Sequence, residues 1–102
     1  MSTESEVEAC RRLAEKYDAE VEVPMPDETR CDLLSDEYAI EVDWATKWAE
    51  AIGQTTLYSI WTRRKPAVLL LLQNADDDKP ELLRAALVCE RLGITLFVEV
   101  AE

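Results

Sequence analysis

Two carboxylates lie two residues apart in the stretch YAIEVDWATKWAEAIGQTTLYS, residues 38–59. Successive side chains of a strand point to opposite faces, so a strand here places Glu41 and Asp43 on the same face. Carboxylates at that spacing can share a divalent cation. Asp32 lies on the preceding predicted strand, and a tight turn would bring it beside Glu41. Three converging carboxylates repel one another unless a cation joins them, so the pattern predicts a metal site.

A helix expected directly after this strand adds polar side chains. At 100° per residue, Lys47, Gln54 and Tyr58 form one line along the helix. Lys47 falls in the first turn, within reach of the carboxylates. The adjoining stripe is expected to pack on the sheet and consists of Trp44, Trp48, Ile52 and Thr55.

Each of these residues also has a purely structural interpretation. Glu41 and Asp43 fit the solvated face of a half-exposed strand, and Asp43 with Lys47 fits an i,i+4 ion pair. Gln54 follows Gly53 and fits a close approach of helix and sheet, while Tyr58 fits the core. The residue pattern alone leaves both interpretations open.

The remaining composition limits the chemistry. The chain has no histidine, which removes Ser-His-Asp and Cys-His schemes and the commonest general base. Its three cysteines, Cys10, Cys31 and Cys89, have no CxxC spacing, so a zinc ribbon is excluded. We expect them to be buried thiols in a reducing compartment. Any hydrolytic chemistry must come from carboxylates, metal, lysine or tyrosine.

The net charge of −11, from 22 acidic and 11 basic residues, disfavours general DNA binding, which depends on basic surface. It favours a protein partner. The longest apolar run, residues 67–72, is too short to cross a bilayer, so no membrane partner is expected. The polar start of the chain lacks a secretory signal, which predicts a cytoplasmic protein.

The hydrophobic periods predict one compact α/β domain over residues 1–102. Its order is helix, three-strand meander, helix, strand, helix, strand. A capping box at Thr3 and Glu6 begins the first helix, and an acidic loop is expected from Asn74 to Asp78. The predicted helices span 4–17, 44–61 and 80–92, and the predicted strands span 19–23, 30–34, 38–42, 67–73 and 94–100.

The order Asp32, Glu41-Val42-Asp43, then Gln54-x-x-x-Tyr58 resembles the PD-(D/E)xK nuclease superfamily. The segment KWAEAIGQ, from Lys47 to Gln54, resembles a group of phage and bacterial hypothetical proteins within it. The resemblance covers nearly the whole chain and implies a restriction-endonuclease-like core. It also implies a magnesium- or manganese-dependent nuclease that cleaves DNA phosphodiesters, working as a homo-oligomer or with a protein partner.

Carried over by position, Asp32 and Glu41 would be metal ligands. Asp43 is a third candidate ligand because it shares the strand face of Glu41. Gln54 would complete the site from the helix, and Glu6 is the candidate from the first helix. The superfamily motif has lysine where this chain has Asp43, so Lys47 would have to supply the ammonium group. The alternative is a catalytically inactive relative whose acidic surface binds a protein.

Overall fold

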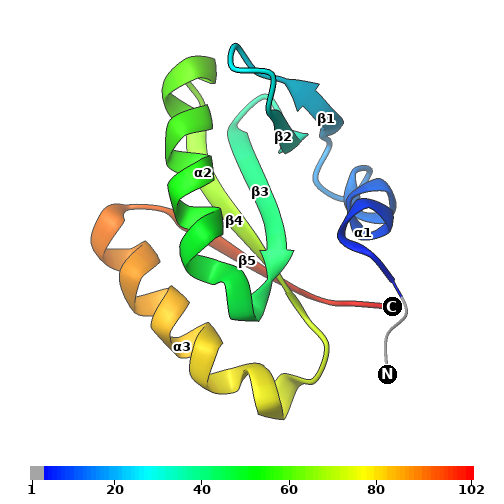
Figure 1. The fold of residues 1–102 in the computed structure, drawn as a ribbon, viewed down its shortest axis with the longest axis vertical. Helices are drawn as coiled ribbons and strands as arrows, with labels where there is room; N and C mark the ends of the chain where they lie inside the picture. Colours follow the sequence, from blue (N-terminus) through cyan, green and yellow to red (C-terminus); the bar gives the residue numbers. More distant parts are fainter. Residues whose placement is uncertain (1–3) are drawn as a thin grey trace.

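A computed structural model describes residues 4–102, which form one domain built on a five-stranded sheet (Figure 1). The helices are α1 (Glu6–Leu13), α2 (Trp48–Thr62) and α3 (Ala75–Leu92), with a short 3₁₀ turn η1 (Ala45–Lys47) before α2. The strands are β1 (Glu20–Pro24), β2 (Arg30–Leu34), β3 (Tyr38–Trp44), β4 (Lys65–Leu72) and β5 (Thr95–Val100). The predicted fold class and element order are confirmed.

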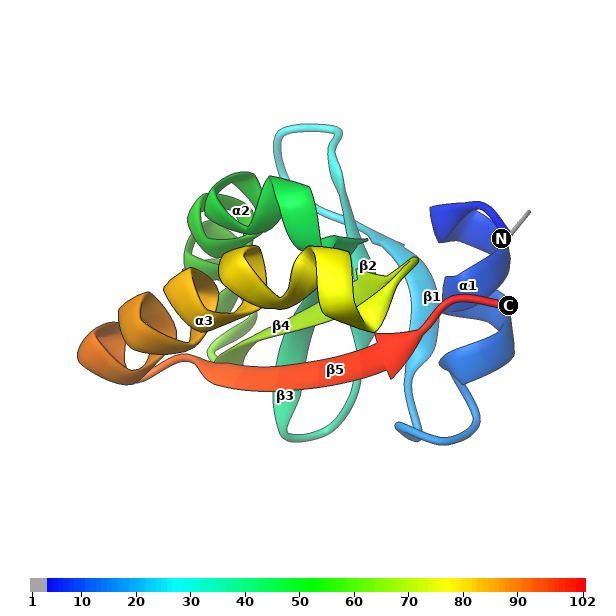
Figure 2. The ribbon, with the colours of Figure 1, turned by 90° about the horizontal axis from the view of Figure 1, so that it is seen from below.

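The strands lie in the order β1-β2-β3-β4-β5. The first three form the antiparallel meander, and β3, β4 and β5 run parallel. Parallel neighbours need a crossover, which α2 supplies between β3 and β4 and α3 supplies between β4 and β5. Figure 2 shows α2 and α3 together, with α1 apart from them.

The core has two main parts, one on each face of the sheet. Apolar residues of α1 pack with Ile40, Val42, Leu69 and Leu71, while α2 and α3 pack with the alternating β4 residues on the other face. Because β4 is covered on both faces, it is apolar without alternation and is buried from Ala67 to Leu72. Among the described helices, none is long and apolar enough to span a membrane.

Helix boundaries differ from the sequence prediction for local reasons. The capping box of α1 is formed by Ser5 and Glu8, with N–O distances of 3.1 and 3.3 Å, and the predicted cap Thr3 lies outside the described residues. The predicted acidic loop is wrong, because Asn74 caps α3 and residues 76–78 form its first turn. Three aspartates there interact favourably with the helix dipole.

Candidate functional site

Asp32 and Glu41 bridge two neighbouring strands with their side chains. The β2–β3 ladder pairs Leu33 with Ile40, and the next pair along would be Asp32 and Glu41. At that point carboxylates replace backbone carbonyls as acceptors. The amide of Asp32 donates to Glu41 Oε1 at 3.2 Å, and the amide of Val42 donates to Asp32 Oδ2 at 2.9 Å. Both carboxylates therefore accept hydrogen bonds from backbone amides. In a continuous ladder, backbone carbonyls would accept them.

Burial and mutual repulsion disfavour ionisation of this pair. Glu41 is 5% exposed. Burial is the main cause that raises the pKa of Glu41, to about 9, and the charges of Asp32 and Asp43 raise it further. Burial also raises the pKa of Asp32, against the opposing effect of the Val42 amide. Both shifts act against ionisation of the two carboxyl groups at once, and the larger printed shift, on Glu41, favours its protonated form.

Glu6 and Asp43 form a second carboxyl pair beside the first. Asp43 is 8% exposed, and its Oδ1 accepts the amide of Trp44 at 2.8 Å. Burial, followed by a hydrogen bond and charge repulsion from Asp43, raises the pKa of Glu6 to about 7, and the charge of Lys47 partly opposes this. The structure thus brings together Glu6, Asp32, Glu41 and Asp43, which we call the carboxylate cluster.

Glu22 is a fifth acidic residue at the cluster, and the sequence did not single it out. It lies opposite Asp32 on β1, between the pairs Val21–Leu33 and Val23–Cys31. Its charge raises the pKa of Asp32. Its φ of 52° is in the left-handed region, which is unfavourable for a non-glycine residue within a strand. The alternating pattern of residues 19–23 predicted that Glu22 lies on a strand. Such a pattern does not indicate where the backbone φ is positive.

The predicted helix residues lie differently from their expected line. Lys47 belongs to η1 and not to α2, and its exposed ammonium is close enough to affect Glu6. Gln54 is exposed, and the structure shows no hydrogen bond from its side chain to the carboxylate cluster. Tyr58 is buried with Met25 and Cys31. Lys47 leaves the line because β3 continues to Trp44 and a 3₁₀ turn precedes α2, which changes the angles around the axis. Gln54 and Tyr58 both lie in α2, but only Tyr58 is on the side of the helix that packs on the sheet.

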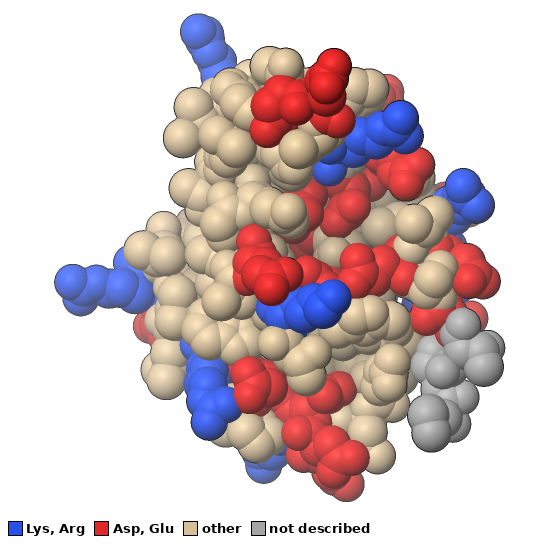
Figure 3. Space-filling model, in the orientation of Figure 1, with Lys and Arg blue, Asp and Glu red and all other residues tan. Residues whose placement is uncertain are grey.

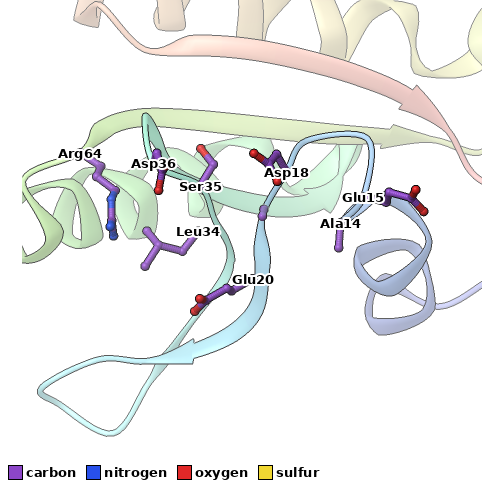
Figure 4. Close-up of a pocket in the computed structure, with 9 residues that line it drawn as sticks. Ala14, Glu15, Asp18, Glu20, Leu34, Ser35, Asp36 and Arg64 are labelled. Atoms are coloured by element: carbon purple, nitrogen blue, oxygen red, sulfur yellow. The ribbon is translucent and has the colours of Figure 1, made fainter.

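The cavity in Figure 4 lies elsewhere on the molecule. It has a volume of about 400 Å³, and its lining comes from the segment between α1 and β1, the start of β1, the end of β2 with the β2–β3 turn, and the α2–β4 corner. Its charged lining consists of Glu15, Asp18, Glu20, Asp36 and Arg64. None of these residues belongs to the carboxylate cluster.

The cluster does not have the arrangement of a cation site in this structure. Over residues 4–102, no group of three or more acidic or thiol side chains is placed to hold a metal ion. Asp32, Glu41 and Asp43 each accept a hydrogen bond from a backbone amide with one oxygen. The arrangement can bind and share protons. The roles predicted for Lys47 and Gln54 stay predictions.

Comparison with known proteins identifies one relative in a virus. The chain is 32% identical, over 97 residues, to the "Putative KilA-N domain-containing protein L33" of Acanthamoeba polyphaga mimivirus. The match covers 95% of this chain and 38% of that protein, so the chain spans well under half the length of its relative. No family model matches, and no solved structure matches.

These findings overturn the resemblance to PD-(D/E)xK nucleases. The matched relative is named for a different domain, and no nuclease family model matches the chain. The prediction of a metal-dependent nuclease is therefore wrong, as is its alternative, an inactive nuclease relative. The restriction-endonuclease-like label has no matching solved structure, and magnesium loses the support that it drew from the superfamily. What the chain shows is a match to a protein named for a KilA-N domain.

Proposed function

We propose that this chain is one domain of a larger DNA-binding protein. The observation that carries the proposal is the 32% identity, over nearly the whole chain, to a KilA-N domain-containing protein. KilA-N domains are DNA-binding domains. The match covers 38% of that relative, and we propose that this chain acts as one DNA-binding part of a protein of that kind, in the cytoplasm.

The surface charge limits where this domain can meet DNA. The net charge of −11 opposes contact with phosphates, and acidic side chains gather over part of the face shown in Figure 3. Three consecutive basic residues, Arg63, Arg64 and Lys65, follow α2, and we call them the basic corner. Arg63 is exposed in a left-handed conformation that ends the helix, and Lys65 pairs with Glu37 at 3.1 Å. The basic corner supplies the phosphate contact.

Fluorescence anisotropy with a labelled DNA duplex tests this function. Two or three phosphate contacts release about two or three counterions, so binding should weaken with salt with a logarithmic slope of roughly −2. The double variant Arg63→Gln/Arg64→Gln should bind at least about fivefold more weakly at low salt.

The matched control is Arg84→Gln/Arg91→Gln, which removes the same charge from α3. This control should retain most of the wild-type affinity. A wild-type chain that shows no salt-dependent binding at about 20 mM salt would overturn the proposed function. Equal losses in the two double variants would retain DNA binding but reject the basic corner.

A further inference from the structure

Another cavity opens where β3 and β4 end, and we call it the strand-end cavity. Its volume is about 210 Å³, and its lining consists of Trp44, Ala45, Thr46, Leu71, Gln73 and Asp78. These residues come from the end of β3, η1, the end of β4, the segment after it and the first turn of α3. The carboxyl ends of parallel strands are the usual ligand side of an open α/β sheet. No residue of the carboxylate cluster lines this cavity.

Trp44 and Leu71 form the apolar part of the strand-end cavity. They are partners in the register of β3 and β4, so their side chains lie next to each other on one face of the sheet. Leu71 is fully buried, whereas Trp44 packs against the core and stays half-buried. A tryptophan that the core already orders loses little side-chain entropy when a ligand covers it. Its ring can stack on a second planar ring.

Asp78 is held in place and keeps one carboxylate oxygen for a ligand. Its Oδ2 accepts the amides of Gln73 and Asn74 at 2.9 and 3.3 Å, which fixes the carboxylate beside the cavity. Within residues 4–102, its Oδ1 accepts no hydrogen bond. A carboxylate oxygen only accepts hydrogen bonds, so Oδ1 favours a ligand that presents an N–H or O–H group.

Thr46 and Gln73 add two polar side chains to the lining. Both are exposed, and neither side chain makes a hydrogen bond within the part of the chain that the structure describes. A hydroxyl and an amide each donate and accept, so they match a ring that has donors and acceptors along its edge. Sites for drug-sized ligands start at about 300 Å³, so this smaller cavity favours a single small ring system.

We propose that the strand-end cavity binds a nucleobase that carries an exocyclic amino group. The base stacks on Trp44, and its amino group donates to Oδ1 of Asp78. Cytosine and adenine present such a group, whereas uracil and thymine present a carbonyl oxygen, which a carboxylate repels. The eight residues of β4 separate this cavity from the basic corner by roughly 23 Å, so the two sites are distinct.

Nucleosides test the cavity, because they carry a base and no phosphate. Cytidine and uridine are a matched pair that differ where an amino group replaces a carbonyl. Cytidine should bind with a dissociation constant on the order of 1 mM, and uridine at least about tenfold more weakly. In ¹H–¹⁵N NMR spectra, cytidine should shift the indole N–H of Trp44 and the side-chain amide of Gln73. The signals of Trp61 and Gln54, which lie on α2, should stay in place.

Asp78→Asn should reverse the preference between the two nucleosides. The asparagine oxygen would accept the amides of Gln73 and Asn74, so its NH₂ group would take the place of Oδ1 and donate. This variant should bind uridine more tightly than cytidine. Asp77→Asn is the matched control, because it removes the same charge from the same turn of α3 and does not line the cavity. It should prefer cytidine, as the wild type does.

A short cytosine-rich single strand identifies the source of the base. Shifts at the same signals as with cytidine would assign an unpaired DNA base to the cavity, and shifts with cytidine alone would assign a free nucleoside. Three outcomes would overturn the proposal. They are unshifted Trp44 and Gln73 signals at about 20 mM cytidine, equal affinities for cytidine and uridine, and an unchanged preference in Asp78→Asn. A loss of salt-dependent DNA binding in the basic-corner variant leaves these results unaffected.

Discussion

Asp32 and Glu41 each hold two strands together and also have a raised pKa. Each accepts a backbone amide across the gap between β2 and β3, and each is largely removed from water. A buried carboxylate that only bridges strands would be stabilised by those amides. Here burial and the neighbouring carboxylates outweigh them, so Glu41 keeps its proton well above the usual pKa.

Stability should therefore depend on pH through Glu41. Its pKa is near 4.5 in the unfolded chain and about 9 in the folded domain, so the folded state binds more protons between these values. The free energy of unfolding should then fall as pH rises from about 5 to about 9. Glu6, with a folded pKa of about 7, acts in the same direction.

Melting temperatures of the wild type and Glu41→Gln across this pH range test the dependence. The variant keeps an oxygen acceptor for the Asp32 amide but cannot ionise, so its profile should be flatter and its stability higher near pH 9. Glu37→Gln, on the exposed β2–β3 turn, is the control and should follow the wild type. Parallel profiles for wild type and Glu41→Gln would show that Glu41 does not control the transition.

Glu22 should be a strained residue whose replacement by glycine is favourable. Its left-handed backbone costs about 1 kcal/mol or more for any residue with a Cβ. Glu22→Gly and Glu22→Ala remove the same charge beside Asp32, but only glycine also removes the Cβ. We expect Glu22→Gly to be more stable than Glu22→Ala by about 1 kcal/mol in urea unfolding. If Glu22→Ala were as stable as Glu22→Gly or more stable, the backbone at Glu22 would not be strained.

Magnesium binding at the carboxylate cluster stays a prediction, and the structure sets a condition on it. A cation that enters must displace the protons held by Glu6 and Glu41. Any binding should therefore release protons and be tighter near pH 8 than near pH 6. Calorimetry in two buffers with different ionisation enthalpies measures that release. Binding that is unchanged in Glu41→Gln would place the cation elsewhere.

At the scale of elements, Thr55 fixes α2 on the sheet. Its hydroxyl lies 2.8 Å from the carbonyl of Ala39 and 2.9 Å from that of Ala67, and it also accepts the Ala67 amide at 3.3 Å. Thr55 is fully buried. One side chain thus joins the helix to both β3 and β4, at the point where these strands begin.

Thr55→Val should destabilise the domain by about 1–3 kcal/mol, because it keeps the shape and leaves the Ala67 amide and two carbonyls without this partner. Thr56→Val is the matched control. The hydroxyl of Thr56 bonds only to the Ile52 carbonyl within its own helix and faces solvent. Chemical denaturation of both variants measures the difference. Equal losses would mean that the hydroxyl of Thr55 contributes no more than a helix-surface hydroxyl.

The elements show where the sequence is informative and where it is not. Strand β2 was predicted at its observed bounds, and the predicted strand at residues 67–73 overlaps most of β4, because these patterns are local. The start of α3 was missed because an acidic run after Asn74 resembles a loop, although it is also a good first helical turn.

The site was predictable to the extent that it depends on strand alternation. The two carboxylates of β3 and the neighbouring Asp32 could be placed together from residue spacing. The positive φ of Glu22, the 3₁₀ turn before α2 and the carboxyl pairing of Glu6 with Asp43 depend on tertiary contacts, so residue spacing could not give them. Function was less predictable still, since acidic triplets are common in a chain with 22 acidic residues.

At the scale of the whole molecule, charge and apolar surface are separated. The acidic side chains gather around the carboxylate cluster and the first turn of α3, while α2 is almost uncharged. The basic corner follows directly after that uncharged helix. A DNA contact at the basic corner would therefore be made next to an almost uncharged helix.

The two ends of the described chain lie side by side (Figure 2). The amide of Glu4 donates to the carbonyl of Glu102 at 3.0 Å, and Arg12 pairs with both side chains. A domain whose ends meet can be inserted into a surface loop of a host protein without pulling the host apart. For the same reason the chain could be joined end to end and reopened at the exposed turn around Asp27, with its sheet order unchanged.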